Sequence, residues 1–239
     1  AFGLALAGYY GAVVVIYIAV VRALPAMDLT PVALLSGYGS DLGWSVAGIA
    51  GLAFSRWLMD GFLMGTTHFS DEIVRARNTA AGAVECGVYL ACGVVLAGVL
   101  REPGGTFLTI GVFFLLGQGM LLLLGRVYAR SAGYDLVGQI RDGNLAAGVA
   151  LGFTLVAFSL IIAKGTSGEF VDWGTNLGFY AFDCVAGVLL LLVLRWLTDL
   201  ALLPQAKIAE EIVRDRNVNA GLIEGVVAVS VAFLILFIF

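Results

Sequence analysis

Charged residues are scarce in this 239-residue chain, where Asp, Glu, Lys and Arg together make up 13% of the sequence and apolar residues 61%. Soluble domains carry about 25% charged residues, so an ordinary soluble domain is excluded. The net charge of −4 and the lack of any basic stripe also exclude nucleic acid as a partner.

Residues that bind metals or react are equally few. The chain has one histidine, His68, and three cysteines, Cys86, Cys92 and Cys184, with no paired-cysteine spacing. Without such spacing, we expect the cysteines to be small buried side chains rather than disulfides or metal ligands. Phosphate-binding loops, nucleophile elbows and zinc-protease motifs are missing as well. We therefore expect no metal, no cofactor and no enzymatic activity.

Long apolar runs are abundant. A bilayer core of about 30 Å requires about 20 apolar residues per helix. Runs of this kind occupy residues 2–24, 42–65, 79–100, 106–129, 145–164, 175–203 and 217–239. The 32 glycines suit membrane helices that pack closely through small residues. The sequence thus predicts an all-α, polytopic transmembrane helical bundle with seven spans.

The chain also repeats itself. The segment Glu72–Glu85 returns at Glu211–Glu224 with nine of fourteen positions identical, and a weaker copy lies at 140–148. Each copy directly precedes an apolar run. The repeating unit is therefore a pair of membrane helices joined by a polar signature loop.

The first apolar run fits the same repeat. Residues 1–22 match residues 80–101 at eight positions, so we interpret 2–24 as the second helix of a pair whose first helix is missing. This predicts eight spans in the complete chain, arranged as two tandem four-helix units, 1–100 and 101–239. An even number of spans per unit gives both units the same orientation in the membrane.

Basic residues in the short loops predict which side faces the cytoplasm. The side of the signature loops holds eight, Arg75, Arg77, Arg126, Arg130, Arg141, Lys207, Arg214 and Arg216. The opposite side holds three, Arg22, Arg101 and Lys164. Cytoplasmic loops carry the excess of Lys and Arg, so we place the signature loops in the cytoplasm.

The signature Ile73-x-x-x-x-Asn78-Thr-Ala-Ala-Gly82 and its relatives at 140–148 and 212–221 resemble the YjfL family of bacterial inner-membrane proteins. That family is catalogued as a domain of unknown function, family 350, built from four-helix units. The resemblance covers the whole chain as two tandem units. It implies a multi-pass protein of the bacterial inner membrane and supplies no established activity.

Each signature places an asparagine just before an apolar helix: Asn78, Asn144 and Asn217. Asparagine is a favoured N-cap, because its oxygen accepts from an unpaired N–H of the first turn. The capped helix starts would alternatively bind an anion or lipid headgroup. The basic loop residues Arg75, Arg77, Arg141, Arg214 and Arg216 would then assist.

Two glutamates, Glu85 and Glu224, each follow their asparagine by seven residues, about 10 Å into a span. Charged groups at such depth are costly and usually face the bundle interior or water. Facing one shared cavity, the two carboxylates would hold a cation or relay a proton. Alternatively, each is a structural partner of an arginine, Arg56 or Arg195.

Further charges lie within the apolar runs. Arg56 and Asp60, and likewise Arg195 and Asp199, are four residues apart and are expected to pair on one helix face at the interface. Asp183 has no acidic counterpart in the other copies, which makes it a third candidate for the ion or proton path. The alternative for Asp183 is a local hydrogen bond to Gln118 or Tyr180.

Two functions are compatible with this sequence. One is a channel or transporter that passes an ion or small solute between two pseudo-symmetric halves. The other is a non-catalytic structural or regulatory subunit whose basic loops dock a membrane or cytoplasmic protein, or anionic lipid. In either case we expect a protein of the lipid bilayer that works as an oligomer or as part of a complex.

Overall fold

The computed structural model describes residues 1–23, 31–63, 69–100, 106–202 and 208–238, and only the backbone for parts of α2, α3 and α8 and for the last residue of α10. Its described residues form helices α1 (Phe2–Ala23), α2 (Pro31–Leu63), α3 (Phe69–Val74), α4 (Thr79–Leu100), α5 (Phe107–Ser131), α6 (Leu136–Arg141), α7 (Leu145–Thr166), α8 (Trp173–Leu202), α9 (Ile208–Val213) and α10 (Val218–Ile238). The predicted all-helical class is therefore confirmed.

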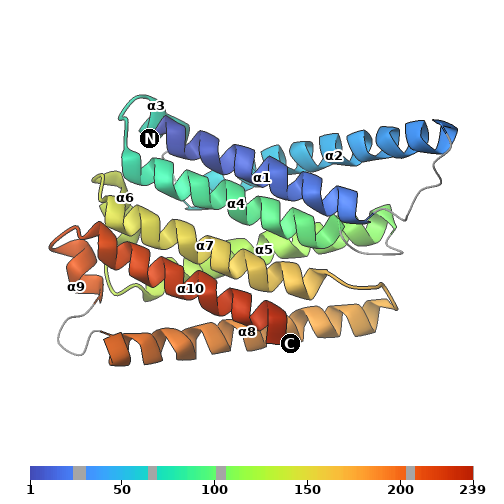
Figure 1. The fold of residues 1–239 in the computed structure, drawn as a ribbon. Coiled ribbons are helices and arrows are strands. Elements are labelled where there is room, and N and C mark those ends of the chain that lie inside the picture. Colours follow the sequence, from blue (N-terminus) through green and yellow to red (C-terminus); the bar gives the residue numbers. More distant parts are fainter. Residues whose placement is uncertain (24–30, 64–68, 101–105, 203–207, 239) are drawn as a thin grey trace.

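Four parallel helices form one layer of the molecule. Helices α1, α4, α7 and α10 lie side by side in that order and begin at the same end, where the short helices α3, α6 and α9 also gather (Figure 1). The most extensive helix contacts are those between α1 and α4, between α4 and α7, and between α7 and α10. We call these four helices the row.

Small residues bring the row helices into backbone contact. A Cβ at Gly87 of α4 would overlap the backbone of Gly152 in α7, and one at Gly98 would overlap Ala163. In a bilayer the hydrophobic effect does not drive helices together, because lipid tails are as apolar as the side chains. Membrane helices associate instead through the van der Waals contacts that such close backbone approach allows. Part of the high glycine content therefore lies at the contacts between the helices of the row.

Three long helices run antiparallel to the row and form a second layer. Helix α2 contacts α1 and α4, helix α5 contacts α4 and α7, and helix α8 contacts α7 and α10. Each thus lies over the groove between two neighbouring row helices (Figure 1). With 33 and 30 residues, α2 and α8 are longer than the 21 or 22 residues of the row helices.

Five helices of the described chain, α1, α4, α5, α7 and α10, are long and apolar enough to cross a membrane. Many large apolar side chains point away from the bundle, among them Phe107, Phe179 and Phe237. Apolar faces of this extent require a lipid environment. The chain is therefore a membrane protein, and its two further spans, within α2 and α8, stay a prediction.

Candidate functional site: the signature loops and the buried acidic residues

Each signature loop joins the end of a short helix to the start of a row helix through three or four residues, 75–78, 142–144 and 214–217. After α6 the N–H of Asn144 donates to the carbonyl of Gln139 at 2.9 Å, as in a Schellman C-cap. After α3 the N–H of Asn78 reaches one residue further back, to the carbonyl of Glu72 at 3.0 Å. The residue before each asparagine has a left-handed backbone: Arg77 at φ 50°, Gly143 at φ 76° and Arg216 at φ 49°. All three loops therefore pass through a left-handed residue just before the asparagine, although one uses glycine and two use arginine. The loop with glycine is one residue shorter than the other two.

The signature asparagines join consecutive copies. The Oδ1 of Asn78 accepts from the N–H of Ala81 at 3.1 Å, and its Nδ2 donates to the carbonyl of Ile140 at 2.8 Å. Asn144 does the same one copy later, accepting from Ala146 and donating to the carbonyl of Ile212 at 2.8 Å. Each side chain thus caps its own row helix and holds the short helix of the next copy.

Asn217 opens the last row helix. Its Oδ1 accepts from the N–H of Asn219 at 3.1 Å, and its Nδ2 donates to Glu211 at 3.1 Å. The link to the next copy was not predicted from the sequence, which pointed to capping or to an anion or lipid headgroup at the helix starts. The signal was the choice of residue, because an amide both accepts and donates whereas an ionised Asp only accepts.

The first buried acidic residue, Glu85 of α4, forms an ion pair with α2. Its Oε1 lies 2.5 Å from the Nε of Arg56, and its side chain is 2% exposed against 33% for Arg56. The guanidinium also lies over the ring of Tyr89, 5.8 Å from its centroid. Asp60, one turn further along α2, is close enough to interact electrostatically with Arg56. This cluster ties α2 to α4.

The second buried acidic residue, Glu224 of α10, meets α5 instead. Its carboxylate accepts from the hydroxyl of Tyr128 at 2.9 Å. Both side chains border a small cavity of about 60 Å³ between α5, α7, α8 and α10. The cavity wall is otherwise apolar, except for Ser131 and Thr154. The side chains of Arg195 and Asp199 lie outside the described residues.

The structure does not bring the two glutamates together. Glu85 lies on α4 and Glu224 on α10, and these helices flank α7 on opposite sides (Figure 1). Glu85 is not among the residues that line the cavity at Glu224. Within the described part of the chain, the two carboxylates therefore do not face the same cavity.

Asp183 of α8 lies near the opposite end of the molecule from the signature loops. Its Oδ1 is 2.8 Å from the Nζ of Lys164, in the last turn of α7. Among the described residues its partner is thus Lys164 rather than Gln118 or Tyr180, whose hydroxyl donates to the carbonyl of Leu116. The pair borders a polar pocket of about 350 Å³ between α7 and α8.

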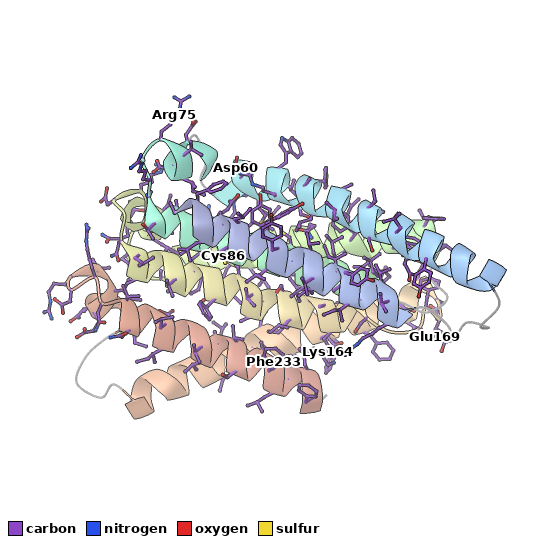
Figure 2. The ribbon with its side chains drawn as sticks, turned by 45° about the horizontal axis from the view of Figure 1, so that its top comes forward. Asp60, Arg75, Cys86, Lys164, Glu169 and Phe233 are labelled. Atoms are coloured by element: carbon purple, nitrogen blue, oxygen red, sulfur yellow. The ribbon has the colours of Figure 1, made fainter. Side chains whose placement is uncertain are left out.

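The basic residues of the signature loops are exposed. Arg75 pairs with Asp71 at 3.2 Å, and Arg214 pairs with Asp215 at 2.9 Å. The hydrogen bond from Arg214 holds the pKa of the Asp215 carboxyl below its usual value. In Figure 2 the side chain of Arg75 projects away from the helices. The signature loops thus present arginines to the solvent, partly balanced by acids.

Comparison with protein families identifies the family of the chain. The model of the Domain of Unknown Function family DUF350 matches residues 1–100 and 104–238. The chain belongs to the DUF350 family. No curated protein and no solved structure matches it. One DUF350 match falls in each of the two predicted four-helix units, and because the family is one of unknown function, the match assigns no activity to the chain.

Proposed function

We propose that this DUF350 protein is a non-catalytic structural subunit of the bacterial inner membrane. Its polar residues hold membrane helices in a fixed arrangement, and its signature loops face the cytoplasm. This is the second of the two functions that the sequence allowed. The arrangement of the buried charges and of the row favours it over a channel.

The observation that carries the proposal is the direct pairing of Glu85 with Arg56. A carboxylate that is 2% exposed and bonded to a cation on a neighbouring helix fixes those helices together. The boundary between the two units is also closed, because α4 and α7 are in backbone contact at Gly87 and again at Gly98. These contacts argue against an ion passage between α4 and α7.

The signature loops supply the surface for a partner in this proposal. Arg75, Arg77, Arg141, Arg214 and Arg216 are exposed at the end of the molecule that we place in the cytoplasm. Basic residues beside a membrane attract anionic lipid, at about 1 kcal/mol per side chain near the surface. We propose anionic lipid headgroups as the first ligand of these loops, ahead of a protein partner.

A second candidate function, passage of a cation or proton, has one observation in its favour. The cavity of about 60 Å³ beside Glu224 and Tyr128 provides a buried carboxylate and a hydroxyl next to open space. Intramembrane acids of this kind often mark proton relays. The path would then run through the second unit alone rather than between the two halves.

The test of the structural role is a double-mutant cycle on Arg56 and Glu85 (Glu85→Leu, Arg56→Met). Leucine is chosen because it stands at the equivalent positions Leu6 and Leu151. Arg56→Met leaves a buried carboxylate unpaired and should lower the free energy of unfolding by about 3 kcal/mol. Glu85→Leu should cost less, because the arginine can reach the interface.

The double variant should be within about 1 kcal/mol of the wild type, because apolar replacement of a whole buried pair is often neutral. Unfolding is measured by steric trapping in bicelles. Arg75→Met, which breaks an exposed pair, serves as the control and should cause no measurable loss. Single variants as stable as the wild type would contradict the structural role.

A further inference from the structure

The row ends on α10 with an apolar face that no helix of the described chain covers. Six side chains at helical spacing form this face, and all are exposed: Asn219, Leu222, Val226, Ser230, Phe233 and Phe237. We call them the outer stripe of α10. On α4 the equivalent positions, 80, 83, 87, 91, 94 and 98, are buried or half-buried against α7.

The contacts within the row follow one register. In the first contact, the residue two positions after the asparagine of one row helix lies against a glycine of the next row helix. That glycine stands four positions after the asparagine of its own helix. Ala80 lies against Gly148 in this way, and Ala146 lies against Gly221. Ala1, the repeat equivalent of Ala80, lies against Gly82.

A second contact lies two turns further into the membrane and keeps the same register. Gly8 of α1 meets Cys86 of α4, and Gly87 of α4 meets Gly152 of α7. One copy later, Phe153 of α7 meets Gly225 of α10. Both contacts therefore recur at each of the three interfaces of the row.

The opposite edge of the row, on α1, carries the matching half of this interface. Gly3 is the repeat equivalent of Gly82, Gly148 and Gly221, and a Cβ there would meet nothing within 4 Å. Ala7 is the equivalent of Cys86, Gly152 and Gly225, and it is exposed. We call the exposed residues Gly3, Ala7, Tyr10, Val14 and Ile18 the outer stripe of α1.

We propose that the row continues from one copy of this chain to the next, with the outer stripe of α10 docked on the outer stripe of α1 of a second copy. The register of the row places Asn219 against Gly3 and Val226 against Ala7. Ser230, an exposed polar residue in the span, would then leave the lipid.

The interface is heterologous, because two different faces meet. Such contacts generate rings when the rotation closes and open arrays when it does not. The proposal holds whether the protein supports the membrane or passes an ion, since it rests on the row alone.

Cross-linking between two tagged chains in native membranes tests this interface. In a background with Cys86, Cys92 and Cys184 replaced by alanine, one full-length chain carries Ala7→Cys and the other Val226→Cys. Oxidation should join the two tagged chains, because the register brings these positions within disulfide reach.

The control replaces Val226→Cys by Leu123→Cys. Leu123 is an exposed residue of α5 and lies about eight residues from the end of the molecule that holds the signature loops. We expect about tenfold less product with this control.

A steric variant tests the register itself. Gly3→Leu enters open space within one chain and should fold normally, but it would overlap the α10 backbone of a neighbour. It should abolish the cross-link, whereas Gly119→Leu, which also enters open space, should not.

Three results would overturn the proposal. One is a product no greater than with Leu123→Cys, which would mean that lipid or another segment covers these faces. The second is joining of two chains that both carry Ala7→Cys, which would indicate a symmetric contact. The third is a cross-link that survives Gly3→Leu.

Discussion

At the scale of the residue, the asparagines and glutamates of the signature copies hold helices together. Asn78 and Asn144 each reach a carbonyl of the following copy, at 2.8 Å in both cases. Glu85 reaches Arg56 across the two layers. These bonds pair polar groups inside a membrane protein, where an unpaired group would cost several kcal/mol. The other carboxylate oxygen of Glu85, Oε2, is buried without a hydrogen-bond partner among the described residues.

Removing the asparagine amides should therefore destabilise the protein to different degrees. Asn144→Ala removes a cap and strands the carbonyl of Ile212, so we expect a loss of about 2–3 kcal/mol. Asn217→Ala removes mainly a cap and should cost about 1 kcal/mol. Unfolding free energies in bicelles check the order.

Asn144→Asp serves as the control, because it keeps the accepting oxygen and loses the donor. It should be closer in stability to Asn144→Ala than to the wild type. Equal losses at Asn144 and Asn217 would show that the link between copies contributes nothing.

The sequence predicted part of this site. Cap positions follow from an asparagine that precedes an apolar run, and pairing of Glu85 with Arg56 was one of two alternatives. The partner of Asp183 was not predicted. Asp183 lies within an apolar run, but α8 is longer than the row helices, and this part of α8 lies level with the last turn of α7, beside Lys164. The sequence does not show how the two helices are aligned.

At the scale of the element, the molecule depends on glycines that face a neighbouring backbone. The length of the apolar runs predicted the spans, and the repeat indicated which helices are equivalent. It did not indicate that the second helices of all copies lie side by side. That arrangement depends on which glycines face a neighbour, which spacing alone cannot tell. Gly87 faces α7, whereas Gly119 faces open space.

This difference gives a matched prediction. Gly87→Val would drive a side chain into the backbone of Gly152, and overpacking at such a contact should cost about 3 kcal/mol. Gly119→Val meets nothing within 4 Å and should leave stability nearly unchanged. The two unfolding free energies are compared in the same bicelles, and equal values would contradict the packing of the row.

At the scale of the whole molecule, the short helices and the starts of all row helices lie at one end (Figure 1). The eight basic residues on that side led us to place it in the cytoplasm. The C-terminal end of α10 lies at the opposite end, with the pair of Lys164 and Asp183.

Sidedness is checked by cysteine labelling in intact cells, with the native cysteines replaced by alanine. A cysteine at Ser167, in the turn after α7, should react with a membrane-impermeant maleimide. A cysteine at Asp142, in a signature loop, should react only after the cells are opened. Both positions are exposed, so accessibility alone would label them equally. The reverse pattern would place the signature loops outside.

The most direct test of the central claim, that the buried charges hold the protein together and do not conduct, is flux. The purified full chain is reconstituted into liposomes and compared with protein-free vesicles and with the Glu85→Gln, Glu224→Gln variant. We predict no ion or proton flux above the empty vesicles from either protein. Flux through the wild type that disappears in a folded variant would contradict the account and place both glutamates on a transport path.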